Sequence, residues 1–216
     1  MSSISPMNDI EKVFYNETEI QRVVTQIGRQ ITADYQDKDL LMVSILKGSV
    51  MFMTDLMRQV DLPCAIDFMA VSSYGSGTKT TGVVQILKDL SHPIEGKDVL
   101  IIEDILDSGM TLDYVMHMLR ARNPRSLRIC TLFDKPSRRQ ADIHADYVGF
   151  EVPDEFIVGY GLDYDEKYRN LPFIGVLKPS VYQNNAVPPE PKGVISWIPA
   201  RICAVYYCMS VSRSSF

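Results

Sequence analysis

Two adjacent carboxylates, Glu103 and Asp104, follow a short apolar run and are the most informative residues of the chain. The run 99–102 is rich in β-branched residues, which predicts a buried parallel strand. In α/β folds, ligands bind outside the carboxyl ends of such strands. Neighbouring strand residues point to opposite faces. A ligand that uses both carboxylates must therefore offer groups to each of them, as ribose hydroxyls or a magnesium-bound sugar do.

The turn Asp-Ser-Gly-Met-Thr at 107–111 comes next, before a predicted helix over 111–122. Backbone N–H groups at a helix N-terminus favour a phosphate. We expect these donors to come from Ser108, Gly109, Met110 and Thr111, with the two hydroxyls adding further hydrogen bonds. The glycine lets the backbone approach the phosphate closely. Carboxylates and turn together predict a site for a ribose phosphate.

The whole stretch 103–111 resembles the signature of the type I phosphoribosyltransferase family. The form Glu-Asp-Ile-Leu-Asp-Ser-Gly-Met-Thr is similar to its 6-oxopurine branch, the hypoxanthine-guanine phosphoribosyltransferases, and the likeness extends over about residues 10–182. It implies an α/β fold with a central, mostly parallel sheet flanked by helices and a small hood. It also implies purine salvage: the phosphoribosyl group moves from phosphoribosyl pyrophosphate to hypoxanthine or guanine, which yields IMP or GMP and pyrophosphate.

The resemblance assigns the purine contacts. It makes Asp107 the general base at the imidazole nitrogen of the purine, although the same residue could simply cap the helix. It makes Lys135 a donor to the exocyclic oxygen, which selects 6-oxopurines over 6-aminopurines. Phe156 would stack on the ring, and the backbone of Ile157 would bind the opposite edge near Asp163. A turn lysine and ordinary core packing are the alternatives.

The resemblance also assigns the pyrophosphate and metal contacts. Lys47, Gly48 and Arg169 would bind pyrophosphate, and the peptide bond before the lysine can be cis in the family. Magnesium would be held by Glu103 and Asp104 and, on the pyrophosphate side, by Asp163. Asp165 and Glu166 compete with Asp163 for the last role, as part of a solvated acidic turn. The polar loop 72–82, with Ser73 and Tyr74, resembles a lid that excludes water.

Bulk properties narrow the class of protein. The chain has 216 residues, a hydrophobic fraction of 46% and a net charge of -5. This length predicts one domain, or one domain plus a small appendage. The charge gives no sign of a nucleic-acid or membrane surface. Four cysteines without a CxxC pair, and no signal peptide or apolar span, predict a cytoplasmic protein without disulfides or zinc.

The pattern of elements predicts strands that alternate with helices, hence a sheet covered on both faces. A capping box of Asn16 and Glu19 opens the first helix. Further helices are expected over 50–60 and 111–122. Strands are expected over 40–46, 64–71, 83–87, 99–102, 127–133, 147–152, 156–160 and 173–177. We expect one phosphoribosyltransferase domain over 1–183 and, after a Pro-rich linker at 187–193, a C-terminal extension over 184–216 of unknown role.

Two rival functions remain open at this point. One keeps the fold and prefers xanthine or another base. The other is a nucleotide-sensing, RNA-binding regulator with the same fold, which a basic surface would favour and the charge of -5 disfavours. The family resemblance further implies a homodimer or homotetramer, small-molecule substrates, and neither nucleic acid nor membrane as a partner.

Overall fold

The computed structural model describes residues 5–73 and 84–183. The helical elements are η1 (Pro6–Asp9), α1 (Glu17–Asp34), α2 (Val50–Met57), α3 (Met110–Arg120), η2 (Pro136–Arg138) and α4 (Pro179–Gln183). The strands are β1 (Ile10–Tyr15), β2 (Leu40–Leu46), β3 (Ala65–Ser73), β4 (Val84–Lys88), β5 (Asp98–Leu106), β6 (Ser126–Asp134), β7 (Tyr147–Glu151), β8 (Ile157–Val158) and β9 (Ile174–Leu177). The expected alternation of strands and helices is present.

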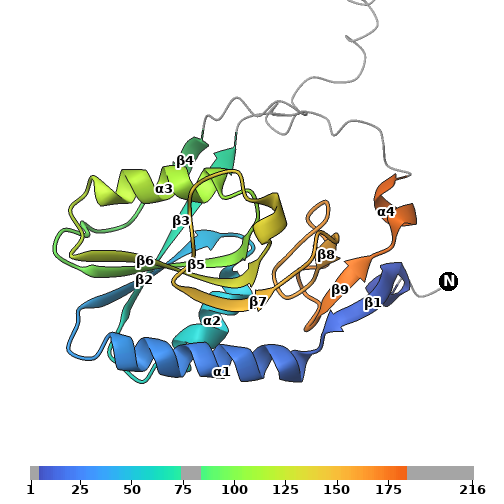
Figure 1. Cartoon of the computed structure of the whole chain (residues 1–216), viewed down its shortest axis with the longest axis horizontal. Coiled ribbons are helices and arrows are strands. Elements are labelled where there is room, and N and C mark those ends of the chain that lie inside the picture. The colour runs from blue at the N-terminus through green and yellow to red at the C-terminus, as the bar shows by residue number, and fades with distance from the viewer. Residues whose placement is uncertain (1–4, 74–83, 184–216) are drawn as a thin grey trace, which may run out of the picture. The chain divides into compact units, whose positions relative to one another are not determined.

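The central sheet has the strand order β4-β3-β2-β5-β6-β7. Its strands pair in parallel, except that β4 is antiparallel to β3. The helices α1 and α2 cover one face and α3 covers the other (Figure 1). Because both faces are covered, β2 is buried over nearly its whole length. The fold class predicted from the sequence is confirmed.

Helix α1 shows how local sequence fixes an element. The side chain of Asn16 accepts a hydrogen bond from the backbone N–H of Glu19 at 3.0 Å, and the Glu19 carboxylate accepts from the N–H of Asn16 at 2.8 Å. This reciprocal pair satisfies two helix N-terminal donors, as predicted. The buried residues of the helix recur at helical spacing: Ile20, Val23, Val24, Ile27, Gly28 and Ile31. They dock α1 against the sheet and α2.

A second, smaller sheet has the order β1-β9-β8 and is antiparallel throughout. It combines a strand from the start of the described chain with two from its end, side by side in Figure 1. This is the expected hood. Strand β1 had not been predicted, because its residues Ile10–Tyr15 alternate poorly: they include a half-exposed Val13 and two charged residues.

Several boundaries differ from the predictions. Strand β8 is limited to Ile157–Val158, and helix α3 ends at Arg120, two residues early. Strand β5 was expected to end at Ile102 but continues to Leu106. Strand β3 continues to Ser73, which pairs with Val84, so Ser73 belongs to a strand and not to the predicted loop. Helix α2 ends at Met57, three residues early. Tyr74, the remaining loop residues 75–82 and the extension 184–216 lie outside the described residues, so the lid and the domain boundary stay predictions.

Within residues 5–73 and 84–183, no helix is both long enough and apolar enough to cross a membrane.

Candidate active site

The two signature carboxylates lie inside β5 rather than after it. The ladder between β5 and β6 runs from Asp98 to Leu106, and Glu103 is paired with Thr131. Both acidic side chains are partly buried. A paired strand restricts the backbone of each acid, so their carboxylates are positioned by the core of the sheet.

Burial strongly affects the charge of this pair. It raises the pKa of Glu103 well above 4.5, and the neighbouring Asp104 raises it further. Burial also raises the pKa of Asp104 to about 6, although the backbone N–H of Ile105 donates to its carboxylate at 2.8 Å. Two carboxylates in one poorly solvated place favour either a proton or a bound cation.

We expect Asp104→Asn to raise the melting temperature at pH 7.5 by about 3 °C, which corresponds to about 1 kcal/mol. The folded-state pKa of about 6 lies above the ordinary value of 3.8. The folded chain therefore binds a proton more tightly than the unfolded chain, and this carboxyl lowers stability as pH rises through 6. The gain should shrink towards pH 5 in thermal denaturation. A gain that is constant from pH 5 to 7.5 would contradict this explanation.

The turn at the start of α3 has the geometry of an anion site. Gly109 is the N-cap residue, with a φ of +79°. A Cβ atom there would lie 2.6 Å from the Ile143 side chain, so only glycine fits. The backbone O of Ser108 accepts hydrogen bonds from the N–H groups of Gln140 and Ala141, at 2.9 and 3.1 Å. The first turn of a helix leaves its N–H groups without partners inside the helix, and these can bind a phosphate.

Two arginines that were not predicted as site residues hold this turn. The Nε atom of Arg138 lies 2.9 Å from Oδ1 of Asp107, and its Nη1 atom lies 3.2 Å from Asp154. Arg139 donates to the backbone O of Asp107 and to the Asp134 carboxylate. The feature of the sequence that could have pointed to them is the pair of adjacent arginines shortly after Lys135 and Pro136. The carboxylate of Asp107, the proposed base, is thus oriented by the guanidinium group of Arg138 in η2.

Lys135 lies at the end of β6, beside the same turn. Its backbone N–H donates to the carbonyl of Leu106 at 3.0 Å, and its Nζ donates to the carbonyl of Glu155 at 2.7 Å. Burial lowers the pKa of Lys135, and the negative charge of Asp107 partly offsets that effect. The lysine lies in the turn before Pro136, as the alternative interpretation has it, and it is buried there.

Phe156 and Ile157 follow Glu155, whose carbonyl accepts the hydrogen bond from Lys135 Nζ, and so lie near this lysine in space. Ile157 is buried in β8, as expected for a residue that can contribute only its backbone. Phe156 is 41% exposed. Its ring stacks on Tyr182 with centroids 5.1 Å apart, and it meets the edge of Tyr164 at 5.5 Å. An aromatic partner thus already covers part of the ring proposed to stack on the purine.

Lys47 and Gly48 follow β2, the neighbour of β5. The peptide bond between Leu46 and Lys47 is cis, as the resemblance allows. A Cβ atom on Gly48 would lie 1.7 Å from Oδ2 of Asp104, so the glycine backbone contacts the signature carboxylate directly. A Cβ atom on Gly161 would in turn lie 2.0 Å from the carbonyl O of Gly48. Three segments distant in the sequence therefore meet here.

Arg169 lies beside Gly161 and Asp163, on the side of the site predicted to bind pyrophosphate. Its Nη1 donates to the carbonyl of Gly161 at 2.7 Å, and its Nη2 lies 2.8 Å from Oδ1 of Asp163. Lys47 Nζ lies 3.0 Å from the carboxylate of Glu166. The two cations and the acid predicted for the pyrophosphate side are thus brought together, along with Glu166, the residue weighed against Asp163 for the metal.

A hydrogen-bonded group next to Arg169 and Gly161, formed by Asp55, Tyr160 and Gln21, was not predicted. The carboxylate of Asp55, on α2, accepts hydrogen bonds from Tyr160 and from Gln21, both at 2.6 Å. Tyr160 has a φ of +45° and immediately precedes Gly161. These residues line a hollow of about 210 Å³ that also reaches Arg169. An aspartate in the middle of a helix gives no signal of this role in the sequence.

Comparison with known proteins identifies the family. The phosphoribosyl transferase domain matches residues 12–165. The chain belongs to the phosphoribosyltransferase family. It is 56% identical over 177 residues to the hypoxanthine-guanine phosphoribosyltransferase of Bacillus subtilis. The aligned residues cover 82% of this chain and 98% of that protein.

Solved structures agree with this assignment to the phosphoribosyltransferases. A crystal structure of a hypoxanthine phosphoribosyltransferase from Staphylococcus aureus superposes with a TM-score of 0.81 at 57% identity, covering 84% of this chain and 99% of that one. A hypoxanthine-guanine phosphoribosyltransferase from Bacillus anthracis gives a TM-score of 0.74 at 44% identity, covering 79% and 98%.

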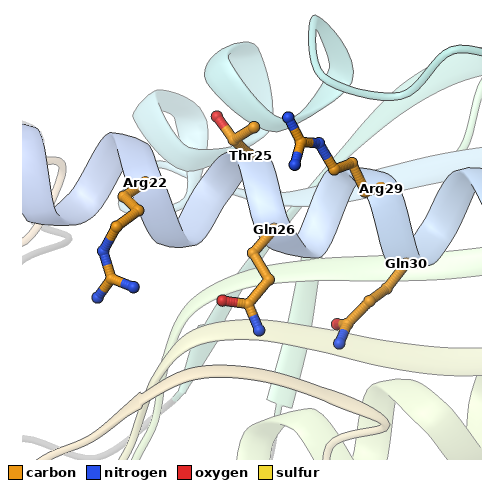
Figure 2. A pocket seen from close by; sticks show the side chains of 5 residues that line it. All are labelled: Arg22, Thr25, Gln26, Arg29 and Gln30. Carbon is orange, nitrogen blue, oxygen red and sulfur yellow. The ribbon is translucent and has the colours of Figure 1, made fainter.

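A larger hollow lies away from the phosphoribosyltransferase signature. It measures about 480 Å³ and is lined by Arg22, Thr25, Gln26, Arg29 and Gln30. Figure 2 shows that all five side chains come from α1, and that the two arginines point in different directions. One helix surface does not enclose a ligand, so the candidate site is the edge of the sheet and not this hollow.

Proposed function

We propose that the chain transfers a phosphoribosyl group from phosphoribosyl pyrophosphate to hypoxanthine or guanine, as the names of its relatives indicate for those proteins. In this reaction a purine nitrogen forms a bond to the anomeric carbon while the bond from that carbon to pyrophosphate breaks. The observation that carries the proposal is the meeting of Gly48 after β2, Asp104 in β5 and the Gly161 segment, just before the turn 107–111 that is proposed to bind phosphate.

Each part of the substrate has a counterpart in the site. The N–H groups and hydroxyls at 108–111 would bind the sugar phosphate, and the carboxylates of Glu103 and Asp104 would hold the ribose hydroxyls. Lys47, Gly48 and Arg169 would bind pyrophosphate. Asp107 would accept the purine proton. These roles are supported by the arrangement of the side chains and by the chemistry each step needs.

Base selection would depend on Lys135. The residue is buried, and the hydrogen bond from its ammonium group to the Glu155 carbonyl fixes the direction of that group. A 6-oxo group can accept a hydrogen bond from it, whereas a 6-amino group would present a second donor. A buried donor left without an acceptor is costly, so the expected discrimination against adenine is large. Phe156, Ile157 and Asp163 would complete the purine contacts.

Magnesium fits the carboxylates of this site. Oxygen ligands suit Mg²⁺, and the raised pKa values of Glu103 and Asp104 reflect a place where two negative charges lack water. Within residues 5–73 and 84–183, no three His, Cys, Asp or Glu side chains form a ready metal cage, so the proposal rests on the pair and on Asp163. Bound magnesium would neutralise pyrophosphate oxygens and hold the ribose hydroxyls.

The test is a nucleotide-formation assay with phosphoribosyl pyrophosphate, Mg²⁺ and each of four bases. We expect product from hypoxanthine and guanine and at least about a hundredfold less from adenine. A dominant product from xanthine would favour the xanthine-preferring alternative. No product from any base would contradict the proposed function. The comparisons do not support a regulator that binds RNA.

We further propose a homo-oligomer. Ile66 and Leu87, on β3 and β4, are 42% and 64% exposed, and Met51 on α2 is 39% exposed. Exposed apolar side chains on the edge strand β4 and its neighbour β3 are of the kind that a contact between protein chains covers. Mass measurement in solution distinguishes a dimer or tetramer from a monomer. The cytoplasmic location stays a prediction.

A further inference from the structure

One carboxylate lies between the two cations of the pyrophosphate side. Oε2 of Glu166 is 3.0 Å from Nζ of Lys47 and 3.6 Å from Nη2 of Arg169. Lys47 follows β2 in the central sheet, and Arg169 lies 122 positions later in the chain. A single oxygen therefore bridges two cations that belong to separate segments. A phosphate oxygen of the substrate would need this position.

We propose that Glu166 is an internal counter-anion that competes with pyrophosphate for Lys47 and Arg169. The inference rests on the proposed function, because it takes those cations as the pyrophosphate contacts. Binding then exchanges a carboxylate oxygen for a phosphate oxygen, and no covalent bond changes. Glu166 keeps the cations paired while the site is empty and lowers the net affinity for pyrophosphate, whether free or attached to ribose.

The geometry makes this exchange easy. The side chains of Lys47 and Glu166 are 68% and 50% exposed, so water screens their attraction and can solvate each of them after separation. Glu166 belongs to the turn 163–166, whose backbone is held by a bond from the Glu166 N–H to Asp163 Oδ2 at 2.9 Å. Because that bond uses the backbone, the side chain can leave the cations while the turn stays in place.

Among the residues that the structure describes, Arg169, unlike Lys47, has further partners near its guanidinium group besides Glu166. Its Nη2 lies 2.8 Å from Asp163 and its Nη1 donates to the Gly161 carbonyl. Glu166 is the more distant of its two acidic partners. Removing the Glu166 charge therefore leaves Arg169 oriented by Asp163 and Gly161, ready for a phosphate oxygen. The same change removes the 3.0 Å carboxylate contact of Lys47.

The experiment compares the full chain with Glu166→Gln and Asp165→Asn. Asp165 is the adjacent acid of the same turn, and its carboxylate lies 3.7 Å from Lys167. Both variants lose one negative charge, but only the first changes a contact of Lys47 and Arg169. The readouts are the dissociation constant of magnesium pyrophosphate by calorimetry and the KM for phosphoribosyl pyrophosphate. Circular dichroism establishes that the variants are folded.

We expect Glu166→Gln to bind pyrophosphate about threefold more tightly, the size of effect typical of an exposed ion pair. The KM should fall by a similar factor, and both gains should shrink at about 0.5 M salt. Asp165→Asn should match the unaltered chain. An unchanged or weaker affinity in Glu166→Gln, or an equal gain in Asp165→Asn, overturns the proposal. The proposed function is judged separately, on the unaltered chain. It stands if that chain forms nucleotide, whatever the variants do. It fails, together with the proposal for Glu166, if that chain neither forms nucleotide nor binds pyrophosphate.

Discussion

Replacing Asp107 by asparagine is expected to lower kcat at least about a hundredfold while the KM for phosphoribosyl pyrophosphate changes little. General base catalysis typically contributes a factor of about 10² to 10⁴, and an amide cannot accept the purine proton. Asparagine keeps the size of the side chain, and the helix cap is unaffected because the N-cap residue of α3 is Gly109. Steady-state kinetics with hypoxanthine, over a range of both substrates, measures the two parameters separately.

The matched control is Asp154→Asn. Asp154 is the second carboxylate near Arg138, at 3.2 Å, whereas Asp107 lies 2.9 Å from that arginine. The control therefore disturbs the same arginine without removing the proposed base, and its kcat should stay within a few-fold of the unaltered chain. A large loss of kcat in Asp154→Asn would assign the effect to Arg138. A loss confined to KM in Asp107→Asn would assign Asp107 to binding.

Gly161→Ala should have the second large effect, on both stability and activity. The φ of Gly161 is +100°, and an added Cβ would lie 2.0 Å from the backbone O of Gly48. A backbone atom cannot turn aside as a side chain can, so the segments around Lys47 and Asp163 must separate. We expect a loss of about 2 kcal/mol in stability. We also expect a fall of about a hundredfold in kcat/KM for phosphoribosyl pyrophosphate, since a displacement of about 1 Å can have that effect.

The control for Gly161→Ala is Gly96→Ala, which introduces backbone strain at a positive φ without a steric clash. Gly96 has a φ of +73°, and no atom lies within 4 Å of a Cβ built on it. This variant should lose about 1 kcal/mol of stability and keep its kcat/KM. Thermal denaturation and kinetics on both variants give the comparison. Equal losses of activity in the two variants would show that the contact between Gly161 and Gly48 is unimportant.

The sequence predicted well what local pattern and chemistry determine. The run before Glu103, the small residues at 107–111 and the capping box at Asn16 each have a local physical cause, and each is found in the structure. Strand ends were less predictable. Strand β5 continues past the acids because β6 supplies hydrogen-bond partners up to Asp134, and a partner strand cannot be read from the strand's own residues.

Residues that act through long-range contacts were missed for the same reason. Arg138 reaches Asp107 across 31 positions, and Asp55 reaches Tyr160 across 105. Each looks like an ordinary surface residue in the sequence, since charged residues on helices and turns usually face water. Glu166 was considered only as an alternative to Asp163 for the metal, in a solvated acidic turn. Its contact with Lys47 depends on how the hood and the central sheet meet.

The length of β5 links the site to the buried core of the protein. The same ladder that carries the fully buried Val99, Leu100, Ile101 and Ile102 continues without interruption into Glu103. Local opening in proteins starts where backbone hydrogen bonds are exposed and apolar contacts are few. Neither condition holds over the residues 99–102, so the backbone that leads into the two acids is anchored in the sheet. Adaptation to a substrate is therefore left to the groups around them, such as the side chains of Lys47 and Glu166.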